Sequence, residues 1–261
     1  MNNETPSNLF PQYADIIRSG KAHWSPSLDS RFRIAQEGDL EVFYAPFDYV
    51  ASRARIVLVG ITPGLVQAKN AFAEAARQLR SGADIETAMR EAKTAASFSG
   101  PMRSNLVRLL DYMRIADWLG INTTAELFGQ AQHLVHYTSV LRYPVFLRGK
   151  NYNGSPRIER SRLLTEQVER WFATEIEQLP DAIYVPLGPV PTAVMNNQVR
   201  KGRLADERVL SGLPHPSGAN AERIAYFMGN KAAADCSSKC NPTKLDAARE
   251  ELARKIDRLG R

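Results

Sequence analysis

Two apolar segments, each followed by a loop rich in glycine and proline, constrain the fold of this chain most. Residues 56–59 (IVLV) precede the loop GITPG at 60–64, and Val209, Leu210 and Leu213 lead into the loop HPSG at 215–218. Short apolar runs of this kind are typical of buried strands. In an open parallel sheet, ligands bind at the carboxyl ends of the strands, and glycine lets the backbone approach a ligand closely. The pattern therefore predicts two ligand-binding loops.

Strands and helices alternate along the chain, which is the signature of an α/β fold. The expected strands span residues 40–44, 56–59, 136–141 and 183–187, and the expected helices span 12–19, 68–96 with a break near Ser81 and Gly82, 104–119, 163–178, 191–198, 222–228 and 244–259. This order fits a three-layer α/β/α sandwich around a central, mainly parallel sheet of about four strands. We expect a single domain over residues 1–261, with an N-terminal extension (1–50) and a C-terminal helix (231–261).

The composition falls inside the globular range and agrees with an enzyme without selecting one, with 261 residues of which 44% are hydrophobic and 24% charged. No apolar run approaches the roughly 18 residues that span a bilayer, and no basic segment precedes an apolar one at the N-terminus. We therefore expect a cytoplasmic monomer without a membrane partner. Cys236 and Cys240 cannot supply the four thiolates of an iron-sulfur cluster, and two surface thiols, a disulfide or half a metal site stay open. No cofactor or metal is expected.

Basic residues are concentrated in one segment of a chain whose formal net charge is +6. Between residues 142 and 162, six basic residues accompany the single acid Glu159, and three aromatic residues lie among them. The basic residues are Arg142, Arg148, Lys150, Arg157, Arg160 and Arg162, and the aromatic residues are Tyr143, Phe146 and Tyr152. Such a segment can follow a phosphate backbone and stack on exposed bases, so it predicts DNA binding, above all by Arg148, Lys150 and Arg157. A solvated loop is the alternative.

At the two loops the chain resembles the uracil-DNA glycosylase superfamily, whose first motif is a Gly-x-x-Pro-Gly-like turn after the first core strand and whose second is His-Pro-Ser. Weaker similarity to the iron-sulfur branch lies at residues 98–100, 137–144 and 182–188, so the resemblance spans roughly 55–227. It implies an α/β/α fold and a divergent branch without the cluster. Residues 68–97 would be a helical insertion, because that branch has a short connection there.

The resemblance also implies roles for most residues of the two loops. A base that leaves its sugar carries negative charge, so the family's histidine, here His215, donates to a carbonyl oxygen of the flipped base. The implied base pocket comprises Gly60, Ile61, Pro63, Gly64, Phe98 and Ser139, and the implied DNA contacts are Ser217 and Gly218 at a phosphate and Asn220 or Arg223 in the vacated stack. A turn histidine with one structural hydrogen bond and core packing of Phe98 are the alternatives.

Two departures from the family pattern bear on mechanism. Where several branches carry a water-activating Asp, Asn or Glu, this chain has Ile61 and Thr62. Thr62 can hold a water but is a poor general base; the other candidates are Gln67, Asn151 and Asn153. Ser139 stands where relatives carry an Asn that reads uracil, and a hydroxyl cannot reproduce the paired donor and acceptor of an amide. Strict uracil specificity is therefore not expected.

These features predict a monofunctional DNA glycosylase that hydrolytically excises uracil or another modified pyrimidine from single- or double-stranded DNA. Lyase chemistry needs a placed amine, and only Lys69 lies near the first loop. A second reading, supported by Ile61 and Thr62, is a catalytically inactive nucleic-acid-binding protein on the same fold. A third is a glycosidase of free nucleosides or nucleotides, against which the basic segment argues.

Overall fold

The computed structural model describes residues 9–20 and 30–259. The chain divides into two compact units, each with its own core. The first unit comprises Met1–Val50, Ile61–Ser97 and Tyr137–Gln178, and the second comprises Ala51–Gly60, Phe98–His136 and Leu179–Arg261. The single domain predicted over residues 1–261 stays a prediction.

The first unit contains an antiparallel sheet in the order β1-β2-β5-β6. Its strands are β1 (Arg33–Glu37), β2 (Leu40–Phe43), β5 (Val145–Leu147) and β6 (Lys150–Asn151). The turn between β5 and β6 consists of Arg148 and Gly149, both with positive φ, as a two-residue hairpin turn requires. Only β2 is predicted from the sequence, because the other strands are short or polar.

The helices of the first unit are α1 (Phe10–Arg18), α2 (Leu65–Arg80), α3 (Ile85–Ala96), α6 (Arg162–Gln167) and α7 (Ala173–Gln178), with a π-helical turn (Val168–Phe172) between the last two. α2 and α3 pack on each other and on α1. The helix break predicted near Ser81 and Gly82 is confirmed, since Ser81 caps α2 and Gly82 has a φ of 87°.

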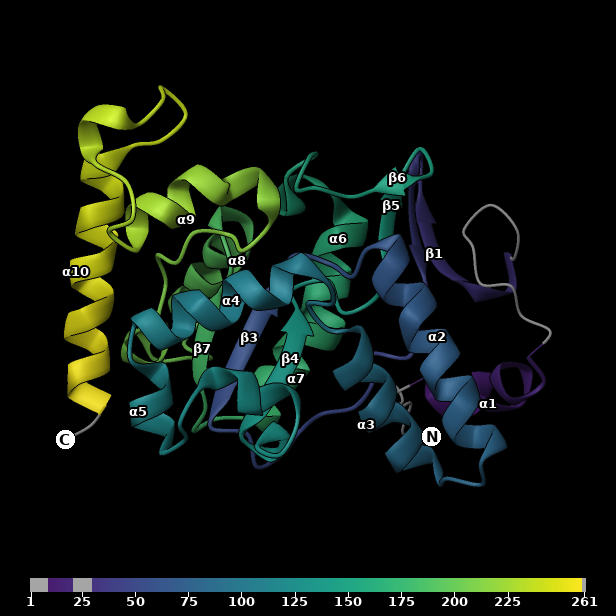
Figure 1. The fold of residues 1–261 in the computed structure, drawn as a ribbon. Coiled ribbons are helices and arrows are strands. Elements are labelled where there is room, and N and C mark those ends of the chain that lie inside the picture. Colours follow the sequence, from purple (N-terminus) through teal and green to yellow (C-terminus); the bar gives the residue numbers. More distant parts are fainter. Residues whose placement is uncertain (1–8, 21–29, 260–261) are drawn as a thin grey trace. The chain divides into compact units, whose positions relative to one another are not determined.

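The second unit is built on two parallel strands, β3 (Ile56–Gly60) and β7 (Ile183–Pro186), which lie side by side in Figure 1. Both strands are fully buried. The sheet order is β4-β3-β7, where β4 (Val135–Ser139) begins in the second unit and its residues 137–139 belong to the first. Val209 adds an isolated parallel bridge to Tyr184 rather than a fourth strand. The predicted α/β class is confirmed, whereas the four-stranded sheet is the antiparallel one.

The helices of the second unit are α4 (Pro101–Tyr112), α5 (Ile115–Leu119), α8 (Pro189–Arg200), α9 (Ala221–Phe227) and α10 (Pro242–Leu259, yellow in Figure 1). α8 contacts β7, and α10 contacts α9 and α5. The single helix predicted over 104–119 is wrong, because Arg114 takes a left-handed φ of 62° that separates α4 from α5. Within the described part of the chain, no helix is long and apolar enough to cross a membrane.

Candidate functional site

The first predicted loop is tied to the segment that follows β4, within the first unit. The Ile61 carbonyl accepts a hydrogen bond from the Leu141 N–H at 3.0 Å. The Thr62 hydroxyl donates to the Tyr143 carbonyl at 3.0 Å and accepts from the Val145 N–H at 3.1 Å. Its proton is thus committed to the backbone, so Thr62 could only accept a hydrogen bond from a water. Its observed contacts fix the loop.

Besides Thr62, three residues are candidates for activating a water, and two of them lie at the same loop. The Gln67 side-chain oxygen accepts from the Gly64 N–H at 2.7 Å, and the Asn151 oxygen accepts from the Leu65 N–H at 3.0 Å. These bonds satisfy amides at the start of α2. Asn153 instead accepts from the Ser155 N–H in its own turn. An amide cannot take a proton from water near neutral pH, so neither Gln67 nor Asn151 replaces a catalytic carboxylate.

A buried ionic cluster lies in the same unit, and the sequence reasoning missed it. Asp48, Lys93, Arg142 and Glu175 are each at most 3% exposed. Arg142 Nε lies 2.6 Å from Glu175 Oε1, and its Nη2 donates to the Trp171 carbonyl of the π-helical turn at 3.3 Å. The signal was a lone arginine inside the otherwise apolar run 140–147, which indicates a buried and paired charge rather than a DNA contact.

The carboxylates of this cluster hold the segment around Ser139. Glu175 accepts from the Thr138 hydroxyl, next to Ser139, which is half-buried at the end of β4. Asp48 accepts from the Tyr143 hydroxyl at 2.7 Å and the Leu9 N–H at 2.6 Å. Burial raises the pKa of Asp48, although these hydrogen bonds oppose the shift, and burial and the Asp48 charge raise the pKa of Tyr143. Charge-assisted hydrogen bonds to buried carboxylates therefore fix residues 138–143.

Burial also disfavours the charged form of Lys93, another member of the cluster. Its ammonium donates to the Tyr49 carbonyl at 2.6 Å. Burial lowers the pKa of Lys93 from 10.5 to about 8, although Glu175 and Asp48 oppose the shift. Between those two values the unfolded chain keeps a proton that the folded chain has lost. Stability from this group therefore rises with pH in that window and is lowest below it.

We expect Lys93→Met to remove this pH dependence. The free energy of unfolding of the wild type should rise by about 2 kcal/mol relative to the variant between about pH 8 and pH 10, from the linkage of a displaced pKa. Urea unfolding at both pH values measures the difference. Lys69→Met, an exposed lysine on α2, is the control and should keep the wild-type slope. Equal slopes for wild type and Lys93→Met would contradict the expectation.

The predicted DNA-binding segment is corrected in part. Tyr143 and Phe146 are 1% exposed and Tyr152 is 5% exposed, so none can stack on a base. Phe146 lies on β5 and Tyr152 directly follows β6, whereas Tyr143 donates its hydroxyl to the buried Asp48 and packs on Trp171. Arg142 is buried with them.

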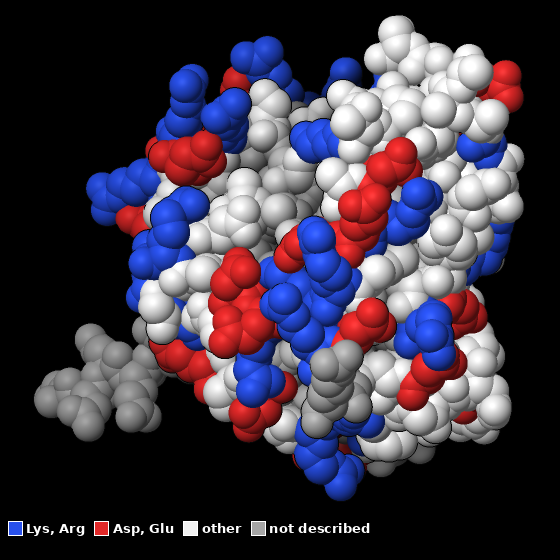
Figure 2. Space-filling view, turned by 90° about the vertical axis from the view of Figure 1, so that its left-hand side faces the viewer, with Lys and Arg blue, Asp and Glu red and all other residues white. Residues whose placement is uncertain are grey.

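The basic residues of that segment on the surface are Arg148, Lys150, Arg157, Arg160 and Arg162. Three of them are ion-paired: Arg148 to Asp39 at 2.7 Å, Arg157 to Glu159 at 3.7 Å and Arg162 to Glu166 at 2.6 Å. On the face drawn in Figure 2, basic and acidic side chains are also interspersed. Exposed pairs of this kind are weak, so the arginines stay available to a phosphate.

The second predicted loop, in the second unit, holds His215 in a defined tautomer. Its Nδ1 accepts a hydrogen bond from the Ser217 N–H at 3.2 Å, and its Cβ lies 3.4 Å from the position that a Cβ on Gly188 would take. Burial lowers the pKa of His215. A neutral imidazole that accepts at Nδ1 carries its proton on Nε2. His215 is therefore a neutral hydrogen-bond donor, held by Gly188 on one side and by its own loop on the other.

The rest of this loop is braced by side chains. Asn105 of α4 donates to the Pro216 carbonyl at 3.0 Å. Asn220 donates to the Ser217 hydroxyl at 3.0 Å and accepts from Arg223 at 2.7 Å. Arg223 also donates twice to the Lys239 carbonyl. Gly218 is exposed beside them. Arg223 is thus held by three hydrogen bonds, and a wedge role would require it to leave them.

The structure groups the predicted residues unit by unit. In the first unit it brings Thr62, Gly64, Gln67 and Asn151 together, and in the second it joins His215, Ser217, Asn220 and Arg223. Ile61, Pro63 and Ser139 also lie in the first unit, and Gly60 lies in the second. Phe98, in the second unit, is 7% exposed with a φ of 49°, which agrees with the core-packing alternative.

The two cysteines lie in the connection before α10. Both are free thiols, and Cys240 is buried. Burial and a hydrogen bond with Cys236 raise the pKa of Cys240 to about 11, so its thiol is protonated and weakly nucleophilic. In the described ranges, 9–20 and 30–259, no three His, Cys, Asp or Glu side chains gather as metal ligands would.

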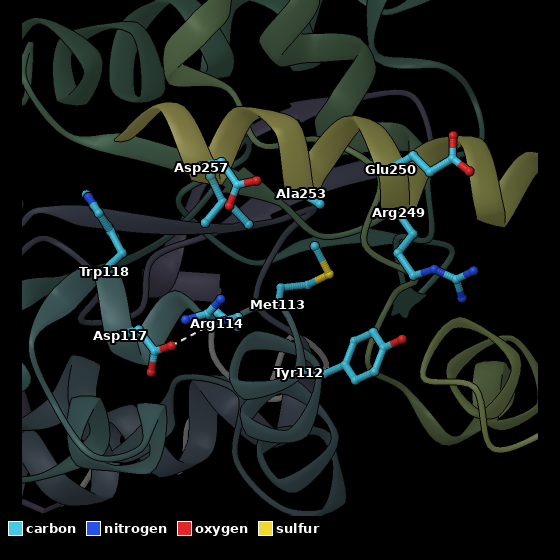
Figure 3. A pocket seen from close by; sticks show the side chains of 10 residues that line it. Tyr112, Met113, Arg114, Asp117, Trp118, Arg249, Glu250, Ala253 and Asp257 are labelled. Atoms are coloured by element: carbon cyan, nitrogen blue, oxygen red, sulfur yellow. Dashed lines mark hydrogen bonds and ion pairs between the residues drawn. The ribbon is translucent and has the colours of Figure 1, made fainter. Parts of the chain in front are cut away.

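A cavity of about 690 Å³ involves none of the predicted residues. It lies in the second unit, where the end of α4, the Arg114 turn and α5 face α10, and it is drawn in Figure 3. Met113 and Ile256 are its buried apolar members. Arg114 is paired with Asp117 at 2.8 Å and Arg249 with Asp246 at 2.7 Å, so the charges of both arginines that line this cavity are balanced by ion pairs.

Fold and loops together define an α/β protein with a neutral histidine donor in one unit and a glycine-rich loop in the other. The chain is 38% identical over 221 residues, 81% of its own length and 86% of the relative's, to "Uncharacterized protein YoxB" of Bacillus subtilis (strain 168). It belongs to the same family as that protein. No family model matches the chain, and no solved structure matches it.

Proposed function

We propose that the chain is a monofunctional DNA glycosylase that releases uracil or another modified pyrimidine by hydrolysis. The observation that carries the proposal is the tautomer of His215. Excision needs a donor aimed at the negative charge that develops on the leaving base. A neutral imidazole with its proton on Nε2, fixed by the Ser217 N–H, is such a donor without a proton-transfer step.

The proposed fold is the three-layer α/β/α sandwich. Its support is the parallel pairing of β3 with β7 and the contact of α8 with β7. The isolated bridge from Val209 to Tyr184 continues the parallel arrangement toward the second loop. In such sheets the loops after parallel strands carry the reacting groups.

The chemistry proposed for the residues is limited to what they can supply. His215 would stabilise the departing base, and Ser217 with the Gly218 N–H would contact a phosphate. No carboxylate lies in the first loop. We therefore expect water to attack a sugar cation, a step in which the water needs little activation. Thr62 would serve by fixing the loop, given its two backbone bonds.

A second candidate is a nucleic-acid-binding protein of the same fold without catalysis. The hydrogen bonds of the Thr62 hydroxyl to the backbone of Tyr143 and Val145 favour this second candidate. They occupy the polar side chain of the GITPG loop, which then has no side chain to activate a water. A panel of single- and double-stranded oligonucleotides carrying uracil, hydroxymethyluracil and bulkier pyrimidines separates the two. Release of any base supports the glycosylase, and binding without release across the panel supports the second candidate.

We expect DNA affinity to fall steeply with salt, because the exposed arginines and lysine at 148–162 would displace counterions from phosphates. Replacing Arg148, Lys150 and Arg157 together by Gln should lower affinity and reduce the slope of log K against log salt by up to about 3. Replacing Lys244, Arg254 and Arg258 of α10 removes the same charge and is the control. A slope unchanged in the first variant would remove this segment from the interface.

A further inference from the structure

The two amides at the first loop use their oxygens and nitrogens differently. The oxygens of Gln67 and Asn151 are occupied by the N–H groups of Gly64 and Leu65, at 2.7 and 3.0 Å. Among the described residues, neither side-chain nitrogen has a hydrogen-bond partner. Asn151 is exposed and Gln67 is half-buried. Two NH₂ groups, each with donors to spare, are therefore presented at the loop.

The orientation of the Asn151 amide is fixed by its surroundings. Rotating the amide by half a turn would set its NH₂ against the Leu65 N–H, a contact of donor with donor. A Cβ on Gly64 would lie 3.2 Å from Asn151 Nδ2, so a larger residue at position 64 would crowd the NH₂ group and require the Asn151 side chain to shift. The group that faces a ligand at this loop is therefore always a donor.

We propose that Asn151, with Gln67 beside it, determines base specificity by donating to a carbonyl oxygen of the extruded base. The inference rests on the proposed function. A 2,4-dioxopyrimidine offers such an oxygen, whereas an aminopyrimidine contacted at its amino group would meet donor with donor. Ser139 offers only a hydroxyl, which cannot reproduce the two N–H donors of an amide, so the amide at the first loop is the better candidate for that recognition.

The same contacts would exist if both amides only capped α2. A cap needs an acceptor, and a carboxylate serves as well as an amide. Asn151→Asp therefore keeps the bond to Leu65 and removes both donors. Gln67→Glu does the same at Gly64. A purely structural role predicts that both variants behave like wild type, whereas a reading role predicts a loss.

The test compares single-turnover release of uracil and of a modified cytosine in one sequence context, for wild type, Asn151→Asp and Gln67→Glu. Asn151→Asp should slow uracil release by about 10- to 100-fold, as an unmade hydrogen bond does, and should narrow the preference for uracil over the aminopyrimidine. Its thermal midpoint should stay at or above that of wild type, because a carboxylate also favours a helix start. Gly64→Ala, which crowds Nδ2, should lower the rate in the same direction.

Binding separates failure of this inference from failure of the proposed function. Oligonucleotides with 2′-fluoro-2′-deoxyuridine or 2′-fluoro-2′-deoxycytidine resist cleavage, so affinity for them can be compared even if no base is released. Wild type should prefer the uridine and Asn151→Asp should lose that preference. Equal affinity of wild type for both, or a wild-type preference that Asn151→Asp retains, would overturn the reading role. Absence of base release alone would overturn only the glycosylase.

Discussion

His215→Ala should lower the single-turnover rate of base release by about 10²-fold or more, which is the cost of losing one donor to a developing anion. DNA affinity should change little, because phosphate contacts supply most of the binding. The reason is local: Nδ1 is occupied by the Ser217 N–H, so the Nε2 proton is the only one His215 can offer. Rate and affinity are measured on the same oligonucleotide, with the best substrate of the panel.

Two variants make the His215 measurement specific. His133→Ala removes an exposed histidine outside both loops and should leave rate and affinity unchanged. Thr62→Ala should cost much less than His215→Ala, since its hydroxyl bonds only backbone. Equal rates for wild type and His215→Ala would remove His215 from the chemistry. A large loss of affinity in His215→Ala would indicate that the substitution disturbs the loop rather than the reaction.

The elements that could be predicted from the sequence are those marked by short-range patterns, such as continuous apolar runs and glycines in turns. The apolar runs at β3 and β7 are continuous and bounded by glycine or proline, so their burial could be predicted. The break between α2 and α3 follows from Gly82, whose positive φ suits glycine alone. The left-handed turn at Arg114 carried no such signal, because an arginine there is uncommon.

The parts of the site that escaped prediction depend on pairs far apart in sequence. Thr62 meets Tyr143 across 81 residues, Asn151 meets Leu65 across 86, and Arg142 meets Glu175 across 33. Nothing in one sequence indicates which acid neutralises which base, so Arg142 falls within the segment that the sequence predicts to bind DNA. The burial of Tyr143, Phe146 and Tyr152 is likewise decided by packing with distant residues rather than by periodicity.

Glu175→Gln should lower the free energy of unfolding by about 3 to 5 kcal/mol, since removing one partner of a buried pair leaves an uncompensated charge. Both side chains of the Arg142–Glu175 pair are 1% exposed. The exposed pair of Arg162 with Glu166 has the same chemistry and the same 2.6 Å distance, with side chains 86% and 56% exposed. Glu166→Gln is thus the matched control, and it should cost below about 1 kcal/mol. Urea unfolding at neutral pH measures both.

The buried pair should also affect the rate of base release. Glu175 accepts a hydrogen bond from Thr138, and Arg142 directly precedes Tyr143, whose carbonyl accepts from the Thr62 hydroxyl. Arg142→Met combined with Glu175→Gln removes both charges of the pair, so the double variant should be more stable than Glu175→Gln alone. If the cluster only stabilises the fold, the double variant regains activity together with stability. If it positions the first loop, activity stays low although stability recovers. A Glu175→Gln variant no less stable than Glu166→Gln would contradict both expectations, since it would mean that the carboxylate is not held as a buried partner of Arg142.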